Sequence, residues 1–319
     1  MTLTGAVAVI YGPTASGKSD LAVTLAERLN GVVINADSLQ VYADLEILTA
    51  RPDAAAMARA PHRLFGVLPA AEACSAAWWR DAALDEIAAA QAAGRHPILV
   101  GGTGLYLKTL MEGLSPVPTA NEAARAKATA LYSEVGGDAF RTALAERDPI
   151  IAARLKSGDR QRLIRAWEVV ASTGTPLSEW QALPKEPGHN LDFSLIGLMP
   201  PRDVLYARID ARFDAMLKHG ALDEAARFEA LSLSPTLPAN KALGLPELRG
   251  HLKGEIGLDE AIRLAQQRSR NYAKRQVTWF RHQPPFAKKS NGQHIRHAEF
   301  GELSERNLTE IMPIILPAG

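Results

Sequence analysis

Hydrophobic and polar positions follow two patterns in the first third of the chain. Short continuous apolar runs, which are typical of buried strands, cover residues 6–11, 32–35 and 98–100. Segments with apolar residues at helical spacing lie between them, at residues 18–29 and 78–92. This alternation predicts a parallel sheet flanked by helices, so we expect an α/β fold.

The pattern changes in the middle of the chain. From residue 120 to about residue 183 it is helical, with prolines on both sides, and an apolar run at residues 193–199 then returns to strand composition. We therefore expect an all-helical insertion, residues 117–189. The core that it interrupts would consist of residues 1–116 and 190–319 and would end in a helical, basic segment.

Composition sets broad limits. A chain of 319 residues with 47% hydrophobic content can bury a large core, and a net charge of +1 argues against a uniformly basic surface. The single cysteine, Cys74, excludes an internal disulfide framework and a cysteine-rich zinc site. The run at residues 6–11 is too short for a signal peptide, and no apolar run approaches 18 residues. We expect a cytoplasmic protein without a membrane span.

The clearest chemical signal is a phosphate-binding loop between the first expected strand and helix. It consists of Gly12, Pro13, Thr14, Ala15, Ser16, Gly17, Lys18 and Ser19. The segment fits the pattern G-x-x-x-x-G-K-[ST], in which loop amides and a helix N-terminus surround phosphate oxygens, the lysine adds a positive charge and the last hydroxyl binds Mg²⁺. The sheet is therefore expected to be P-loop NTPase-like.

The loop does not identify the rest of the ligand. Nucleotide hydrolases and kinases usually carry an acidic residue at a second strand end, but the strand at residues 97–100 runs into a glycine-rich turn instead. Asp37, just after the strand at residues 32–34, is the nearest acidic candidate. Ligands of parallel sheets bind beyond the carboxyl ends of the strands, so we expect Asp37 and Thr103 to face the same crevice as Lys18.

Four segments together resemble the tRNA dimethylallyltransferases. They are residues 12–19, Asp-Ser-Leu-Gln-Val-Tyr at 37–42, Gly-Gly-Thr-Gly-Leu-Tyr at 101–106 and Gln-Arg-Leu-Ile-Arg at 161–165. The resemblance extends from about residue 12 to 281. It implies transfer of a dimethylallyl group from dimethylallyl diphosphate to N6 of the adenosine 3′ to the tRNA anticodon, with release of diphosphate.

The resemblance also assigns roles to individual residues. It implies that Asp37 accepts the proton from N6, that Thr103 orients the base or the leaving group, and that Lys18 stabilises the diphosphate together with the loop. Ser19 is the expected Mg²⁺ ligand. Arg208 and Arg212 share one face of a helix, and one of them is expected to reach the diphosphate, because arginine can bind such oxygens in bidentate fashion. The resemblance favours Arg208, and a structural ion pair with Asp210 or a neighbouring acid is the alternative.

Contacts with the tRNA anticodon stem-loop are expected from both parts of the chain. The residues are Asp37, Ser38, Leu39, Gln40, Thr103, Arg125, Gln161, Arg162, Leu163, Ile164 and Arg165. From the residues alone, the basic cluster at 154–165 favours a solvated helix face, and it is the resemblance that favours tRNA contact instead. A second basic stretch, residues 263–281, contains Tyr272 and Trp279, which are either stacking partners for RNA bases or core residues.

Several features depart from the family pattern or remain open. Residues 46–52 and 241–248 differ from the usual family sequences, which leaves the loop after Asp37 and one tRNA contact undetermined. Of Trp78 and Trp79, we expect one ring in the core and the other partly exposed. His294 and His297 are interpreted as tail residues and not as a metal site.

Three other functions are compatible with parts of the sequence. An adenylate isopentenyltransferase acting on AMP, ADP or ATP would use the same core, a P-loop nucleotide kinase would use the same loop, and an RNA-binding module would use the basic segments. The helical insertion and the basic segments favour a tRNA substrate, because a mononucleotide does not require them. We expect the enzyme to act as a monomer.

Overall fold

The structure is a computed structural model that describes residues 3–185, 189–286, 295–302 and 304–316. The chain separates into two compact units. The first contains Met1–Met111 and Gly188–Gly319, and the second contains Glu112–Pro187. The second unit thus begins slightly before the insertion expected at residues 117–189 and ends slightly before its expected end.

The first unit is built on a six-stranded parallel sheet with the order β3-β2-β4-β1-β5-β6. Its strands are β1 (Leu3–Tyr11), β2 (Gly31–Asn35), β3 (His62–Arg63), β4 (His96–Gly101), β5 (His189–Leu198) and β6 (Ile295–Phe300). β1 pairs with β4 on one side and β5 on the other, and Tyr11 is opposite Gly101. The carboxyl ends of β1, β2 and β4 are therefore neighbours.

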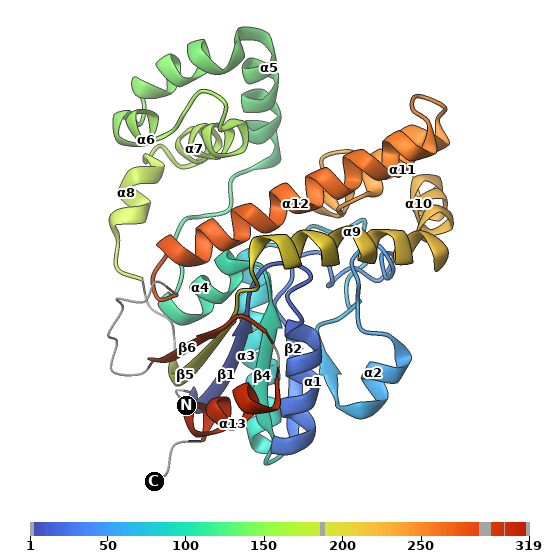
Figure 1. Ribbon diagram of the computed structural model, residues 1–319. Helices are drawn as coiled ribbons and strands as arrows, with labels where there is room; N and C mark the ends of the chain where they lie inside the picture. The colour runs from blue at the N-terminus through green and yellow to red at the C-terminus, as the bar shows by residue number, and fades with distance from the viewer. Residues whose placement is uncertain (1–2, 186–188, 287–294, 303, 317–319) are drawn as a thin grey trace. The chain divides into compact units, whose positions relative to one another are not determined.

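Helices cover both faces of this sheet (Figure 1). Val7 and Val9 of β1 point to the face covered by α3 (Ala76–Ala92), where Trp79 is fully buried. Ala8 and Ile10 point to the opposite face, which is covered by α1 (Lys18–Leu29) and α13 (Glu305–Ile315). Both faces of β1 are buried, which explains its continuous apolar sequence.

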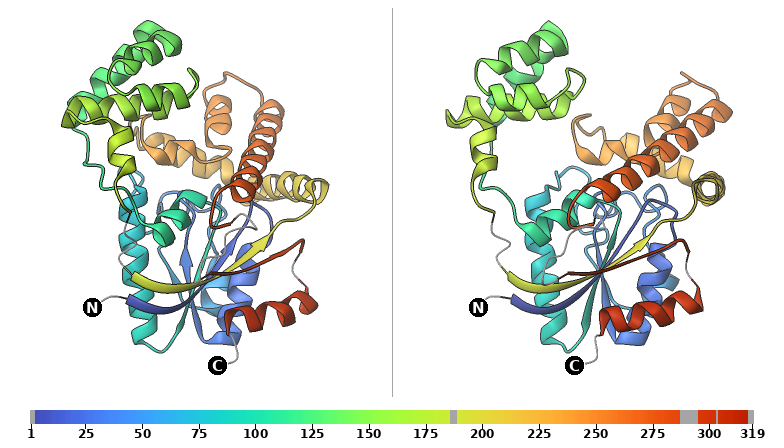
Figure 2. Two further views of the ribbon diagram at one scale, coloured as in Figure 1. Left: turned by 90° about the vertical axis from the view of Figure 1, so that its left-hand side faces the viewer. Right: turned by 60° about the vertical axis from the view of Figure 1, so that its left-hand side comes forward.

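The remaining helices of this unit are α2 (Ala54–Arg59), α4 (Gly104–Glu112), α9 (Arg202–Lys218), α10 (Ala221–Ala230), a short 3₁₀ helix η1 (Pro238–Lys241), α11 (Leu245–Leu252) and α12 (Leu258–His282). α9 and α12 pack against each other beyond the carboxyl ends of the strands (Figure 2). Leu205 and Ile209 of α9 contact Ala273 of α12 there. These two helices form the wall opposite the sheet.

The second unit is all-helical, as the sequence predicts. It contains α5 (Glu122–Ala145), α6 (Pro149–Arg154), α7 (Arg160–Thr173) and α8 (Leu177–Ala182). Phe140, Leu163 and Val169 lie in its core. Asp148 is fully buried and caps α6 through the N–H of Ile151, and it also accepts a hydrogen bond from the N–H of Ser178. One carboxylate thus joins the starts of α6 and α8.

Most of the expected elements are confirmed, with strand ends displaced by a few residues. Residues 53–63, which the sequence pattern leaves unassigned, contain α2 and the two-residue strand β3. Trp79 is buried and Trp78 is 37% exposed, as expected for the pair. His294 lies outside the described residues, whereas His297 is in β6 and its ring hydrogen-bonds to the Tyr11 hydroxyl. No helix among the described residues is long and apolar enough to span a membrane.

Candidate active site

The phosphate-binding loop follows β1 and leads into α1. Gly12 is required by close packing, because a Cβ atom there would lie 2.4 Å from the Leu198 carbonyl oxygen. Gly17 has a φ of 90° and precedes the first residue of α1. The Ser16 hydroxyl is buried without a hydrogen-bond partner among the described residues. The loop therefore presents an unsatisfied polar atom together with the amides of a helix N-terminus.

Lys18 bends back over the loop. Its Nζ atom donates a 3.2 Å hydrogen bond to the Pro13 carbonyl. Burial lowers the pKa of Lys18 to about 8, and the nearby Asp37 carboxylate opposes this shift while Arg212 adds to it. A partly desolvated ammonium group is thus held at the centre of the loop, where an anionic ligand would favour its charged form.

Asp37 lies at the carboxyl end of β2, and two hydrogen bonds with the buried Asn35 side chain fix its backbone. The Asn35 side chain accepts a 2.8 Å hydrogen bond from the Asp37 N–H and donates a 3.0 Å bond to the Asp37 carbonyl. The Asp37 Oδ1 atom accepts a 3.0 Å hydrogen bond from the Leu39 N–H. The carboxylate is therefore oriented by its own turn.

Thr103 connects the ends of β4 and β2. Its hydroxyl accepts a hydrogen bond from the Ser38 N–H at 3.0 Å and donates one to the Ser38 hydroxyl at 3.3 Å. It also interacts with the Tyr272 hydroxyl. Burial, and to a smaller extent Asp37, raises the pKa of Tyr272, which keeps this phenol protonated. Thr103 therefore contacts the residue that directly follows Asp37, so the ends of β2 and β4 lie together.

α9 contributes an arginine to the loop, but not the expected one. Arg212 donates a 2.5 Å hydrogen bond to the Thr14 hydroxyl. Burial lowers the pKa of Arg212, and the nearby Asp37 carboxylate opposes part of this shift. Arg208 is exposed and does not line the pocket. The two arginines are one turn apart, and only the later one reaches the loop where α9 passes it. The expectation for Arg208 is therefore corrected to Arg212.

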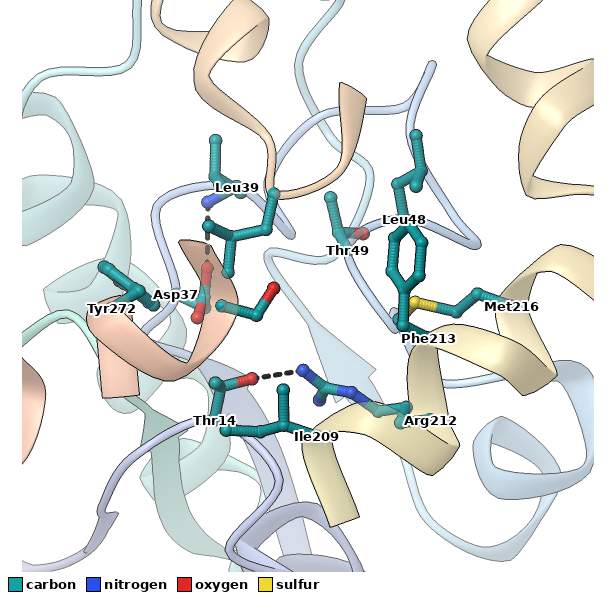
Figure 3. A pocket seen from close by; sticks show the side chains of 12 residues that line it. Thr14, Asp37, Leu39, Leu48, Thr49, Ile209, Arg212, Phe213, Met216 and Tyr272 are labelled. Carbon is teal, nitrogen blue, oxygen red and sulfur yellow. Dashed lines mark hydrogen bonds between the residues drawn. The ribbon is translucent and has the colours of Figure 1, made fainter. Parts of the chain in front are cut away.

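A pocket joins these groups (Figure 3). Its polar lining residues are Thr14, Asp37, Thr49, Arg212, Ser269 and Tyr272. Its apolar lining residues are Leu39, Leu48, Ile209, Phe213, Met216 and Leu243. The Arg212 guanidinium and Thr14 of the phosphate-binding loop lie at one end of the pocket, and Leu48, Phe213 and Met216 lie at the other (Figure 3). This arrangement suits a ligand with an anionic head and a short apolar tail, with a carboxylate beside it.

Gln276 of α12 is part of the site, although the sequence analysis did not select it. Its Oε1 atom accepts a 2.9 Å hydrogen bond from the Thr14 N–H, and its Nε2 atom donates a 2.9 Å bond to the Gly102 carbonyl. The side chain is 5% exposed. One amide thus connects the phosphate-binding loop with the loop that carries Thr103. Nothing in the local sequence distinguishes this glutamine from a surface residue of a polar helix.

Tyr272 and Trp279, for which the sequence allowed two interpretations, both contact site segments. Tyr272 lines the pocket beside Asp37. Trp279 packs on Gly104, where a Cβ atom would lie 2.1 Å from the indole ring. Glycine at this position therefore lets α12 approach the start of α4.

The basic residues of α12 are in part neutralised. Arg263, Arg268 and Arg270 pair with Glu260, Glu247 and Asp210. Lys274, Arg275 and Arg281 are exposed, and no salt bridge is recorded for them within the described chain. The available positive charge therefore lies in the C-terminal half of the helix.

The other predicted tRNA-contacting residues lie in the second unit. Arg125, Gln161 and Arg162 are exposed, and Ile164 is partly buried. Leu163 is fully buried in the core of this unit, so its side chain cannot contact tRNA. Arg165 forms a 2.7 Å salt bridge with the buried Glu168. Arg162 is thus free to face solvent, whereas Arg165 is engaged inside its own unit.

Among the described residues no group of three or more His, Cys, Asp or Glu side chains could hold a metal ion. Ser19 is exposed at the start of α1. A single hydroxyl can take part in Mg²⁺ binding only together with phosphate oxygens and water. The donor set therefore fits a metal that arrives with a phosphorylated ligand.

Comparison with known proteins gives a consistent result. The family model described as IPP transferase matches residues 40–283, and the model described as isopentenyl transferase matches residues 5–65. A tRNA dimethylallyltransferase of Rhodospirillum centenum is 54% identical over 96% of both chains. One from Paramagnetospirillum magneticum is 57% identical, over 89% of this chain and 90% of the relative.

Solved structures agree with this similarity. The full-length tRNA isopentenylpyrophosphate transferase of Bacillus halodurans superposes with a TM-score of 0.65 and 33% identity, covering 98% of this chain and 94% of its own. A eukaryotic dimethylallyltransferase acting on tRNA gives a TM-score of 0.73 and 29% identity, covering 86% of this chain and 70% of its own.

Proposed function

The chain belongs to the IPP transferase family, and we infer from this membership that it is a tRNA dimethylallyltransferase. It transfers the dimethylallyl group of dimethylallyl diphosphate to N6 of the adenosine next to the 3′ side of the tRNA anticodon. The observation that carries the assignment of the site is the pocket, which joins a phosphate-binding loop, a short apolar chamber and a carboxylate.

We propose that the loop and two cations bind the diphosphate. Lys18 donates to the Pro13 carbonyl and Arg212 to the Thr14 hydroxyl, and the Ser16 hydroxyl and the N-terminal amides of α1 complete the cradle. When the C–O bond of the dimethylallyl diphosphate breaks, negative charge develops on the departing diphosphate. Donors fixed in advance stabilise this charge more than they stabilise the bound substrate.

Asp37 is the proposed proton acceptor. N6 of adenine is a weak nucleophile because its lone pair is delocalised into the ring, and it becomes acidic as the new C–N bond forms. Asp37 is held by Asn35 and Leu39 at the edge of the pocket, with one carboxylate oxygen available for the proton. A general base of this kind contributes about 10²–10⁴ in rate. Thr103 holds the Ser38 turn beside it.

We propose Mg²⁺ as the cofactor and Ser19 as its protein ligand. The metal would supply charge neutralisation for the departing diphosphate. Ser19 is accessible at the start of α1, directly after Lys18, which places its hydroxyl beside the phosphate-binding loop.

The anticodon stem-loop is the proposed region of contact in the tRNA. Lys274, Arg275 and Arg281 of α12 and Arg162 of α7 offer exposed positive charge for its phosphates. The target base must leave its stack to be modified, at a cost of a few kcal/mol that such contacts offset. All proposed catalytic groups come from one chain, which is compatible with a monomer, and the tRNA substrate suits the cytoplasm.

The reaction can be tested directly. The purified protein is incubated with radiolabelled dimethylallyl diphosphate and either unmodified tRNA or AMP, with and without Mg²⁺. We expect label in tRNA, none in AMP, dependence on Mg²⁺ and no requirement for ATP. Label in AMP would assign the chain to the adenylate isopentenyltransferases instead. Transfer that depends on ATP would contradict the assignment of the loop to diphosphate.

A further inference from the structure

The N–H groups of the loop at residues 46–48 donate hydrogen bonds to a side chain that is far away in sequence. The Glu224 Oε1 atom accepts hydrogen bonds from the N–H groups of Glu46 at 2.7 Å and Ile47 at 2.9 Å. Its Oε2 atom accepts one from the Leu48 N–H at 2.8 Å. Glu224 is 4% exposed, and no salt bridge is recorded for it within the described part of the chain. Three charge-assisted bonds therefore satisfy a buried carboxylate.

The same loop is restrained on its other side. The Gln40 Nε2 atom donates to the carbonyls of Thr49 at 2.9 Å and Ala50 at 2.8 Å. Glu224 thus holds the N–H groups of the loop, and Gln40 holds the carbonyls that follow. Neither side chain lines the pocket itself, whereas Leu48 and Thr49 do. The loop's position is therefore set from outside the pocket.

Leu48 closes the apolar end of the pocket. It is 4% exposed and lies beside Phe213 and Met216 (Figure 3). A Cβ atom on Gly244 would lie 2.5 Å from the Phe213 ring and 3.3 Å from Leu48 Cδ2. Gly244 therefore packs closely behind Phe213 and Leu48, and a longer apolar ligand that extended in this direction would have to displace Leu48.

We propose that Glu224 is a positioning residue for prenyl transfer. By holding the backbone at residues 46–48 it fixes Leu48 as the end wall of the pocket, and this wall limits the allylic diphosphate to a five-carbon chain. The inference rests on the proposed function, because it concerns which diphosphate that site accepts. Glu224 acts through Leu48 and touches no reacting atom.

Glu224→Gln tests the role of the carboxylate. Glutamine retains one carbonyl oxygen, and its NH₂ group must face at least one N–H group that the carboxylate now accepts from, which leaves a buried donor unsatisfied. We expect the KM for dimethylallyl diphosphate to rise about tenfold. The ratio of kcat/KM for the five-carbon over a ten-carbon allylic diphosphate should fall about tenfold, with an unchanged KM for tRNA.

A matched control lies in the same helix. Glu229 pairs with Arg249 and Lys253 and not with the 46–48 loop. Glu229→Gln should lower the Tm without changing the discrimination between the two diphosphates. A Glu224→Gln variant that behaves in the same way, with a lower Tm and unchanged discrimination, overturns the proposal.

Leu48→Ala tests the wall while keeping all three hydrogen bonds to Glu224. It should increase kcat/KM for the ten-carbon substrate at least tenfold relative to the five-carbon one. If Glu224→Gln does not fold, Leu48→Ala still tests the wall on which the proposal depends, and unchanged discrimination in this variant overturns the proposal. If the wild-type protein transfers no five-carbon group to tRNA, the proposed function fails, which is distinguishable from failure of the wall.

Discussion

Replacing Asp37 with Asn separates proton transfer from binding. The amide oxygen of Asn can still accept the hydrogen bond from the Leu39 N–H, and Asn35 still fixes the backbone through two hydrogen bonds. The variant should therefore fold and keep the shape of the pocket. Asparagine cannot accept a proton at neutral pH, so the variant loses the proposed function of a general base, and it also loses the negative charge of the carboxylate.

The expected loss follows from the role of a general base. Turnover should fall by about 10²–10⁴, which corresponds to about 3–5 kcal/mol in the activation barrier. A second effect is electrostatic. Asp37 raises the pKa of Lys18, so its neutralisation should bring that pKa below its present value of about 8. The comparison is best made near pH 6.5, where Lys18 stays charged in both proteins.

Single-turnover transfer of labelled dimethylallyl to saturating tRNA measures the chemical step. Equilibrium binding of tRNA and of dimethylallyl diphosphate is measured separately. We expect both affinities to change less than threefold. Near-normal transfer by Asp37→Asn would exclude Asp37 as the base. Equal losses in binding and turnover would show that it positions substrate instead.

Three further predictions concern the cationic side chains of both units. Because Lys18 has a pKa lowered by burial to about 8, kcat/KM for dimethylallyl diphosphate should fall as the pH rises through 8, and Lys18→Met should remove that alkaline limb. Arg212→Ala should weaken diphosphate binding at least tenfold, whereas Arg208→Ala, its exposed neighbour, should leave it unchanged; equal effects would contradict the placement of Arg212. Arg162→Ala should reduce the magnitude of the slope of log K for tRNA binding against log salt concentration by roughly 0.7–0.9. Arg165→Ala should instead destabilise the helical unit by about 1–3 kcal/mol in thermal unfolding, since Glu168 loses its partner.

The sequence predicts those parts of the site that are local in the chain. Residues 12–19 carry their own geometry, because the glycines and the start of α1 follow directly from β1. Asp37 and Thr103 could be placed in one crevice because parallel strands bring their carboxyl ends together. Arg212 could not be distinguished from Arg208, since the choice depends on how far α9 extends past the loop. The burial of Leu163 was also missed, because the basic residues around it obscure its place on the apolar side of α7.

Other contributors were invisible because their partners are far away in sequence. Glu224 binds N–H groups 176 to 178 positions earlier. Asn35 looks like an ordinary strand end, yet it is fully buried and its side chain donates a hydrogen bond to the Leu64 carbonyl, 29 positions later. A single sequence contains no signal for such pairings, which depend on the packing of α9, α10 and α12 over the sheet.

The Gln276 bridge has a consequence for how the protein is made. It joins α12 to Thr14 and Gly102, which precede it by 262 and 174 positions. During synthesis the N-terminal strands leave the ribosome long before α12, so the phosphate-binding loop emerges without the amide that fixes it. A nascent chain truncated before α12 can form the early β-α-β units, but its loop lacks this restraint. Competence to bind diphosphate is therefore acquired only after translation of the last long helix, as a late step in folding.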